Sequence, residues 1–421
     1  MAVQPLNEAL VLQADLIALY LPMHTATRLA AKLIPCLKSL NAQAHLCCYG
    51  LYAPTNEEYL RQLGVGTILG GEFETGLITL FDRLSSADGL DGVQTQVQPP
   101  ISLDRQDFLV PHRALLPALD DYAQLVAPDG SLRLAGYTEA SRGCKYLCRH
   151  CPIVPIYNGR FRIVQHDIVL ADIRQQIEAG AQHITFGDPD FLNGPGHAIP
   201  IVEAMHREFP NLTYDVTIKI EHLLKYDHLL PVLRDTGCLF ITSAVEAVDN
   251  NILSRLDKGH TRNGFMWAAT RLRELGLVLN PTFIAFTPWT TASVYLEMLS
   301  VIKELNLINS VAPIQYAIRL LIPAGSRLLE LPDIQDLVQP YDQSALYYPW
   351  QHPDPKIDQL YEHIFRLVHQ NQKDSASRSS LFTNIWQAAL DAAPNLKSTY
   401  PEDTIWDLAA KPVPRLSESW Y

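Results

Sequence analysis

The segment SRGCKYLCRHC, residues 141–151, places three cysteines in one short stretch of chain. Cys144, Cys148 and Cys151 follow a CxxxCxxC spacing, so a single tight loop can supply three thiolates. Iron–sulfur clusters are commonly held by four cysteines, so three thiolates on a [4Fe–4S] cluster leave one iron open. An open iron can bind the amino and carboxylate groups of a small molecule, which is the arrangement that radical chemistry from S-adenosylmethionine (SAM) needs.

A structural zinc site would use the same cysteines, with His150 completing a Cys3His set of ligands. Structural zinc sites usually come as two separated pairs of ligands that staple two chain segments together. The sequence contains no second pair of that kind. The remaining cysteines lie in apolar runs, where small buried core residues are expected: Cys36, Cys47, Cys48 and Cys238. The spacing therefore favours the iron–sulfur cluster.

Composition indicates a cytoplasmic protein of more than one domain. The chain has 421 residues, which exceeds a typical domain of ~150 residues, and no apolar stretch reaches the ~18 to 20 residues of a membrane span. The first residues lack the basic start and apolar stretch of a signal peptide, and the seven cysteines do not form a disulfide framework. A net charge of −12 without a long basic run excludes general binding to nucleic acids or to anionic membranes.

Positive charge is nevertheless concentrated around the cysteines. Arg142, Lys145 and Arg149 interleave them. Charges so close to a thiolate-bound cluster must act on it, so we expect these three side chains to compensate its negative charge. The alternative is that they are solvated charges of an exposed loop.

Residues 1–90 alternate between expected strands and helices, which favours a small α/β unit with a parallel sheet. The strands are expected at 15–21, 44–49 and 66–69, and the helices at 28–40, 57–63 and 74–84. Residues 91–130 contain PP, VPHR, LLP and APDG, so an extended linker with short helices is expected there.

From residue 131 to residue 331 a strand–helix pattern repeats six times. The strands are expected at 132–137, 183–187, 213–218, 239–245, 277–285 and 310–321. This content predicts a partial (β/α)6 barrel, in which chemistry takes place at the carboxyl ends of the strands. The cysteines follow the first of these strands, in agreement with that rule. Residues 332–421 begin rich in Tyr, Trp and Pro and continue as helix, so we expect a helical C-terminal extension that caps the barrel or contacts a partner.

Over residues 132–329 the chain resembles radical SAM enzymes. The cysteines are followed in the family's order by GDPDF (187–191), SAVEAV (243–248) and LDKGHT (256–261). In that family an aromatic residue before the last cysteine packs near the adenine, and here His150 takes its place. The next strand of the family ends in a motif that receives the methionyl amino group, so the resemblance implies this role for Gly187, Asp188 and Asp190. An Asx turn or a helix cap is the structural alternative for the two aspartates.

The resemblance further implies that Ser243 and Glu246 contact the ribose and the methionyl end of SAM. A hydroxyl suits a diol, and a carboxylate suits an ammonium group. A solvated strand end is the alternative for Glu246. Lys258, His260 and Thr261 lie in the segment that follows in such proteins.

The activity implied by the resemblance is reductive cleavage of SAM, which gives a carbon radical that acts on a small-molecule substrate. An electron donor such as flavodoxin or ferredoxin would supply the electron. Two alternatives stay open. One is transfer of the 3-amino-3-carboxypropyl group of SAM to an acceptor such as arsenite, and the other is a redox-sensing cluster without turnover.

The N-terminal unit resembles a cobalamin-binding Rossmann-like domain, above all in VGTILGGEFETGLITLFDRL (65–84). The DxHxxG motif that supplies the cobalt-ligating histidine in such domains is absent. His24 and His45 are not part of such a motif, and a histidine in an apolar segment is more often a structural residue than a metal ligand. Cobalamin binding is therefore doubtful, and we expect a degenerate domain used for contact with a partner or substrate.

The end of the chain, IWDLAAKPVPRLSESWY (405–421), resembles the corresponding part of a group of radical SAM proteins with a cysteine- or selenocysteine-containing C-terminal signature. That group is related to the enzyme that forms the carbon–arsenic bond of arsinothricin. The sequence stops where the signature would begin. We expect either that this protein lacks the signature or that its reading frame continues past Tyr421 through a selenocysteine codon.

Overall fold

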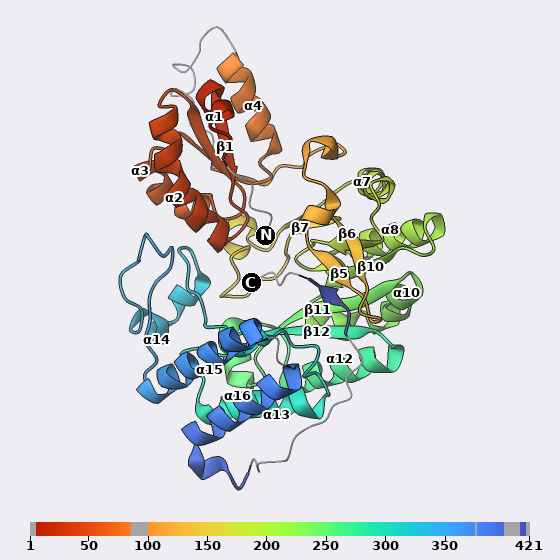
Figure 1. Cartoon of the computed structure of the whole chain (residues 1–421), viewed down its shortest axis with the longest axis vertical. Helices are drawn as coiled ribbons and strands as arrows, with labels where there is room; N and C mark the ends of the chain where they lie inside the picture. The colour runs from red at the N-terminus through yellow and green to blue at the C-terminus, as the bar shows by residue number, and fades with distance from the viewer. Residues whose placement is uncertain (1–5, 86–99, 375–376, 400–412, 418–421) are drawn as a thin grey trace.

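A computed structural model describes residues 6–85, 100–374, 377–399 and 413–417 of the chain. Its strands form a four-stranded sheet, a seven-stranded sheet and a two-stranded pair. Figure 1 shows the N-terminal sheet and its helices as a lobe beside the larger sheet, with the C-terminal helices below the larger sheet. The fold is the α/β architecture that the sequence predicts.

The N-terminal lobe is built on four parallel strands in the order β1-β2-β3-β4. These strands are β1 (Leu16–Tyr20), β2 (His45–Tyr49), β3 (Thr67–Gly71) and β4 (Ile101–Ser102). The helices of the lobe are α1 (Glu8–Gln13), α2 (His24–Leu40), α3 (Glu57–Gln62) and α4 (Glu74–Ser85). Central strands buried by helices read as near-continuous apolar runs, which is why the sequence pattern locates β2 and β3 well. The short β4 comes from the segment expected to be a linker.

The large sheet has the order β12-β11-β10-β9-β6-β5-β13. Five of its strands are parallel: β6 (Leu132–Thr138), β9 (His183–Phe186), β10 (Thr213–Thr217), β11 (Cys238–Glu246) and β12 (Val278–Phe283). At one edge β5 (Gln124–Val126) and β13 (Arg415–Leu416) add antiparallel strands. The sheet curls into a partial barrel, as predicted.

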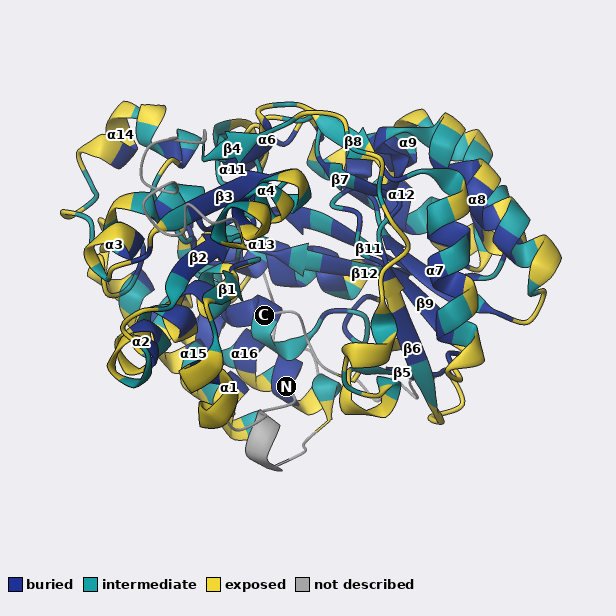
Figure 2. Cartoon of the chain, turned by 90° about the horizontal axis from the view of Figure 1, so that it is seen from above, coloured by how far each residue is buried: buried dark blue, intermediate teal, exposed yellow. Residues whose placement is uncertain are grey.

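Helices cover the outside of this partial barrel. They are α7 (His166–Glu178), α8 (Pro195–Glu208), α9 (Ile220–Lys225), α10 (Leu230–Asp235), α11 (Asn250–Leu256), α12 (Arg262–Leu275) and α13 (Ala292–Glu304). Figure 2 shows buried residues along the strands and exposed residues on the outer faces of the helices. A short pair of strands, β7 (Ser141–Gly143) and β8 (Phe161–Ile163), brackets the cysteine loop together with α6 (Val154–Tyr157).

The predicted sixth barrel strand, residues 310–321, is wrong as a full strand. Pro313–Ala317 form a 3-10 helix, and only one parallel bridge, between Phe286 and Arg319, continues the barrel at this edge. Proline has no backbone N–H and cannot donate to a strand ladder, so Pro313 interrupts the run. The apolar pattern of the stretch arises because its side chains are buried, with Tyr316 only 2% exposed.

The C-terminal extension contains α14 (Pro332–Gln335), α15 (Pro355–Asp374) and α16 (Arg378–Ala392). The segment before α15 docks on the N-terminal lobe, since the Tyr341 hydroxyl donates to Asn56 Oδ1 at 2.9 Å. Of the tail 405–421, only residues 413–417 lie within the described part of the chain. There β13 pairs with β5, while Asn280 of β12 donates to the Pro414 carbonyl at 3.3 Å. This segment therefore contacts both edges of the large sheet.

Within the described residues, no helix combines the length and the apolar character that crossing a membrane requires.

Replacing Ile241 by Ala tests the position of β11 in the core. Ile241 is fully buried, and truncation of such a side chain costs about 2 to 5 kcal/mol of unfolding free energy through lost apolar burial and a cavity. Ile78→Ala on α4 is the control, because Ile78 is 59% exposed and should lose less than about 0.5 kcal/mol. Urea unfolding measures both. Equal losses in the two variants would contradict the placement of β11.

Candidate functional site

The cysteine loop is held in place from both sides. It begins after β7 at Gly143, whose φ of +75° and contact with the Tyr157 ring leave no room for a Cβ atom. Within the loop, the Arg149 backbone N–H donates to the Leu256 carbonyl at 3.0 Å, and Arg327 donates to the Leu147 carbonyl at 2.8 Å. The loop is therefore anchored to α11 and to the segment before the C-terminal extension.

The three motif thiols lie close enough to influence one another. Cys148 is buried, and Cys144 and Cys151 are half-buried. Burial raises the pKa of the Cys151 thiol to about 12, and the neighbouring Cys148 and Cys144 add to the rise. In the described part of the chain, no three His, Cys, Asp or Glu side chains are already gathered as a preformed metal site. The chemistry of this donor set, three thiols on one loop, fits a cluster that needs three thiolates.

Two buried lysines supply positive charge beside these thiols. Lys219 Nζ lies 3.6 Å from Cys148 Sγ and 3.4 Å from the centre of the Tyr146 ring. Lys258 is 3% exposed, and its ammonium acts electrostatically on Cys148 and Cys151. A buried ammonium group is costly unless anionic partners surround it, so these lysines mark a place where negative charge belongs.

The expectation that Arg142, Lys145 and Arg149 compensate the cluster is wrong, because the structure engages all three elsewhere. Lys145 Nζ donates to the Asn193 carbonyl at 3.1 Å, and Arg149 donates to the last carbonyls of α11. Arg142 turns toward three carboxylates, those of Glu72, Glu74 and Glu139. Their closeness in the sequence does not translate into contact with the thiols.

The structure brings together two of the predicted SAM contacts, His150 and Glu246. Glu246 Oε1 lies 3.0 Å from His150 Nε2 and accepts from Lys258 Nζ at 3.3 Å. Burial alone would raise the pKa of Glu246, but the charges of Lys258 and His150 outweigh it and hold the pKa at about 2. Glu246 has a φ of +65°, where the pairing of β11 with β12 shifts register. Such backbone strain clusters at functional sites.

His260 lies near Glu246 and Lys258 and lacks a hydrogen-bond partner. It is 7% exposed, and neither ring nitrogen has a hydrogen-bond partner in the structure. Burial, followed by the charges of Lys258 and Lys219, lowers the pKa of His260 to about 4. A buried polar side chain without a partner requires an explanation, and a ligand that supplies the missing hydrogen bonds is one. The motif LDKGHT identifies the residue, but only the structure shows that it is unpartnered.

The GDPDF segment serves partly to hold the loop. Gly187 donates its N–H to the Thr138 carbonyl at 2.8 Å, and the Tyr137 hydroxyl packs where a Cβ of Gly187 would lie. Asp188 accepts from the Ala140 N–H at 2.8 Å and from the Ser141 hydroxyl at 2.6 Å. Both Asp188 oxygens are thus used immediately before the cysteine loop, in contacts that are neither an Asx turn nor a helix cap.

Asp190 and Ser243 also have partners within the protein. Asp190 Oδ2 lies 2.7 Å from His222 Nδ1, both side chains are fully buried, and His222 Nε2 lies 2.9 Å from the Tyr146 hydroxyl. This chain of contacts links the end of β9 to the cysteine loop. The Ser243 hydroxyl donates to the Ile218 carbonyl at 2.6 Å and so ties β11 to β10.

From the sequence, Lys219 and His222 lie near a predicted strand end, where either a role in the site or simple ion pairing is possible, whereas no pattern gives Tyr146 or Asn193 a role in the site. Lys219 and His222 follow β10 directly, so their position at a strand end was a usable signal. Asn193 holds the loop by donating to the Gly143 carbonyl at 3.3 Å, and no motif marks it.

A comparison with protein families identifies the domain that contains the cysteine loop. Residues 138–292, which include the cysteine loop and β9 to β12, match the family model of the Radical SAM superfamily. The chain contains a radical SAM domain.

Curated relatives of the radical SAM domain include methyl- and methylthiotransferases. The hopanoid C-3 methylase of Methylococcus capsulatus is 26% identical over 228 residues, which cover 53% of this chain and 43% of that protein. The ribosomal protein uS12 methylthiotransferase RimO of Legionella pneumophila is 22% identical over 215 residues, covering 47% and 49%. The chain therefore spans about half the length of these curated relatives.

Solved structures share the fold beyond the radical SAM domain. The cobalamin-dependent SAM radical enzyme OxsB, with aqua-cobalamin and SAM bound, superposes with a TM-score of 0.69 at 16% identity, over 94% of this chain and 66% of that chain. The radical SAM methyltransferase TsrM from Kitasatospora setae gives 0.58 at 16% identity, over 69% and 60%. At this identity the likeness concerns the fold.

The N-terminal lobe beside the radical SAM domain offers a poor surface for cobalamin. Ligands of open α/β sheets bind at the carboxyl ends of the strands. There Tyr20, Tyr49 and Phe73 pack together, with ring centres of Tyr49 and Phe73 4.9 Å apart. His24 Nε2 donates to the Ala345 carbonyl at 2.7 Å, and His45 Nε2 lies 2.8 Å from the Thr67 hydroxyl, so both histidines are already engaged.

The state of His260 predicts a specific pH dependence. The unfolded chain has a histidine pKa of about 6.5, and the folded pKa is about 4, so below about pH 6.5 the unfolded state binds more protons. Stability is therefore complete above about pH 6.5 and falls by about 2 to 3 kcal/mol as the pH approaches 4. His260→Gln should remove this part of the loss, measured by urea unfolding at pH 7 and pH 4.5. The same loss in both proteins would contradict a neutral, buried His260.

Proposed function

We propose that this chain is a radical SAM enzyme that holds a [4Fe–4S] cluster on Cys144, Cys148 and Cys151 and acts on a small-molecule substrate. When bound, the cluster supplies the electron that cleaves a carbon–sulfur bond of SAM and leaves a carbon radical. The observation that carries the proposal is the joint burial of the three thiols, two ammonium groups and an unpartnered histidine at the carboxyl ends of the barrel strands.

The protein's part in this chemistry is to hold thiolates, SAM and substrate in place. The ammonium groups of Lys219 and Lys258 favour the thiolate forms of the cysteines, because an opposite charge within a few ångströms stabilises the charged form. The contacts from Asp190 through His222 to Tyr146 fix the loop from the β9 and β10 sides.

The SAM contacts divide into two kinds in this proposal. His150 and Glu246 contact each other near His260, and we therefore assign both residues direct contact with SAM. Gly187 allows close approach at the end of β9, because it carries no Cβ. Asp188, Asp190 and Ser243 have protein partners, so we assign them the positioning of strand ends around SAM.

We assign residues 1–90 to a cobalamin-binding-like Rossmann domain, 91–130 to a linker, 131–331 to the radical SAM barrel and 332–421 to the C-terminal extension. The first domain serves substrate or partner contact in this proposal, because the DxHxxG motif is absent and His24 and His45 already have partners within the protein. All seven cysteines are free thiols. This agrees with a reducing cytoplasm, where a flavodoxin or ferredoxin can supply the electron.

Cys148→Ala tests the cluster assignment. After anaerobic reconstitution the wild-type chain should contain about four irons and cleave SAM, whereas Cys148→Ala should lose SAM cleavage to the uncatalysed background. Cys36→Ala is the matched control, because Cys36 is exposed on α2 and should keep both iron and activity. Circular dichroism checks that each variant is folded.

Three results of this experiment would contradict the proposal. One zinc per chain without colour would indicate a structural zinc site. Tight cluster binding without SAM cleavage would indicate a redox sensor. Full SAM cleavage by Cys148→Ala would exclude the three-cysteine ligand set.

Product analysis decides which carbon–sulfur bond breaks. Cleavage at the 5′ carbon gives 5′-deoxyadenosine, which is the product we expect. 5′-Methylthioadenosine would instead establish transfer of the 3-amino-3-carboxypropyl group, to an acceptor such as arsenite. Chromatography of the reaction mixture with and without a chemical reductant separates the two.

A further inference from the structure

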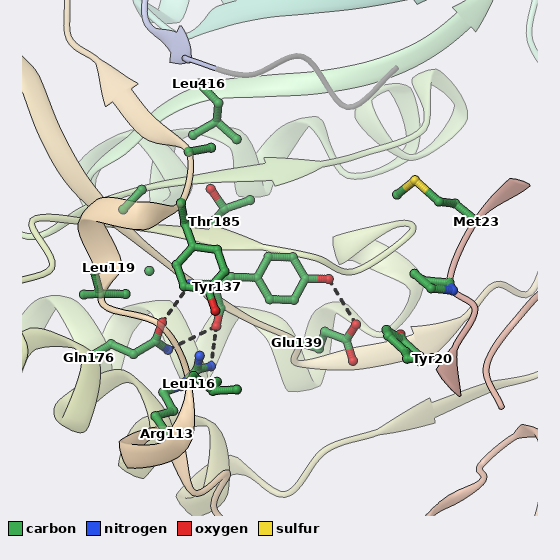
Figure 3. Close-up of a pocket in the computed structure, with 15 residues that line it drawn as sticks. Tyr20, Met23, Arg113, Leu116, Leu119, Tyr137, Glu139, Gln176, Thr185 and Leu416 are labelled. Atoms are coloured by element: carbon green, nitrogen blue, oxygen red, sulfur yellow. Dashed lines mark hydrogen bonds between the residues drawn. The ribbon is translucent and has the colours of Figure 1, made fainter. Parts of the chain in front are cut away.

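A cavity of about 660 Å³ opens between the N-terminal lobe and the inner face of the partial barrel. Figure 3 shows its walls, which come from the end of β1, from the segment 113–123, and from β6 and β9. The largest lining side chains are apolar or aromatic and are between 37% and 52% exposed: Tyr20, Met23, Leu116, Tyr122 and Tyr137. These side chains are thus exposed toward one shared hollow.

Such a hollow has the character of a small-molecule site. Ligand pockets are concave, have volumes of about 300 to 1,000 Å³ and are lined mainly by apolar and aromatic side chains with a few placed polar groups. Large apolar side chains that stay exposed together usually mark a binding surface. The cavity meets both descriptions.

Glu139 is the single carboxylate among the lining residues. The Tyr137 hydroxyl donates to its Oε1 at 3.1 Å, and Arg142 Nε donates to its Oε2 at 2.9 Å, which fixes the carboxylate at one end of the cavity. The other charged lining residue, Arg113, is occupied by a two-pronged contact with Asp172 at 2.7 and 2.8 Å. The cavity therefore presents negative charge to a ligand.

Glu139 shares the positive charge of Arg142 with two other carboxylates. Arg142 also pairs with Glu74 and lies 3.5 Å from the carboxylate of Glu72. The Glu72 side chain is completely buried, and its Oε2 has no hydrogen-bond partner. Arg142 is thus shared by three carboxylates, with Arg162 acting on Glu72 as well. A further cation at Glu139 would therefore be favourable.

The cavity adjoins the site assigned to SAM. Tyr137 lines the cavity, and its hydroxyl packs directly against Gly187, at the end of β9. Thr185 of the same strand also lines the cavity and donates to Asp215 at 2.7 Å on the neighbouring β10. A molecule in the cavity would therefore lie on the inner face of the barrel next to the predicted SAM contacts.

We propose that this cavity binds the substrate, and that the substrate is a small organic cation with an apolar body and an amine that rests on Glu139. The inference rests on the proposed function and adds the chemical class of the substrate. Tyr20, Tyr122 and Tyr137 surround the space with aromatic rings, whose faces attract cations. Burial and the charge of Glu139 raise the pKa of Tyr20 to about 12, so its hydroxyl stays neutral and contributes no second anion.

Three probes with the same phenylethyl body and end groups of different charge test the inference. Phenethylamine, 2-phenylethanol and 3-phenylpropionate are titrated against the full chain, and affinities are measured by calorimetry or ligand-observed NMR. The amine should bind about tenfold more tightly than the neutral alcohol, because only the amine can form an ion pair with Glu139 and a cation–π contact with the aromatic rings. The acid should bind more weakly than the alcohol. Equal affinities, or a preference for the acid, would overturn the proposal.

Two glutamate variants provide a matched comparison. Glu139→Gln should remove the preference for the amine, whereas Glu74→Gln should keep it, because Glu74 shares the same guanidinium but does not line the cavity. Tyr122→Ala gives a second test if Glu139→Gln fails to fold, since Tyr122 is 44% exposed and should tolerate truncation. It should weaken amine binding, and unchanged binding would exclude this cavity.

The probes are titrated against the anaerobically reconstituted chain in the presence of SAM, and SAM cleavage is measured separately on the same preparation. Failure of amine binding would therefore leave SAM cleavage intact, and failure of SAM cleavage would leave amine binding intact. The two proposals can be separated on these grounds.

Discussion

Burial of charge beside the three cysteines is the constraint on which the site depends. Lys219 and Lys258 are 7% and 3% exposed, and an ammonium group so far from water needs anionic neighbours. Lys258 finds Glu246, and Lys219 finds Glu221 and the Cys148 thiol. Three thiolates at this place would be the anionic neighbours that the lysines need, and the lysines offset part of the cost of burying thiolates.

The partial barrel is what makes this charge arrangement possible. Lys219 follows β10, Glu246 ends β11, and the cysteines follow β6 after a short connection. Parallel strands place all their carboxyl ends at one edge, so residues far apart in sequence meet there. Contacts inside the protein keep that edge rigid, above all Asp188 on the residues before the loop and Asp190 through His222 on Tyr146.

The sequence predicts the cysteine loop and most strands because both depend on local spacing. Five of six barrel strands follow from buried apolar runs, whereas the sixth fails because an apolar run containing Pro313 can be buried as a 3-10 helix. The contacts within the site are less predictable from the sequence, because they do not depend on local spacing. Arg142, Lys145 and Arg149 adjoin the cysteines in sequence but bond elsewhere, whereas Lys219, distant in sequence, reaches Cys148. Side-chain direction decides these contacts, and spacing alone does not report it.

The N-terminal lobe is tied to the cysteine loop by the same residues that shape the cavity. Glu72 directly follows the third strand of the lobe, accepts from the Tyr157 hydroxyl at 3.0 Å, and lies beside Arg142. Arg142 in turn holds Glu139 at the cavity. A cation bound at Glu139 would relieve the excess of carboxylates on Arg142 and so strengthen the contact between lobe and barrel. In our proposal the substrate cation and the contact between lobe and barrel thus share one guanidinium, which gives the lobe a function without cobalamin.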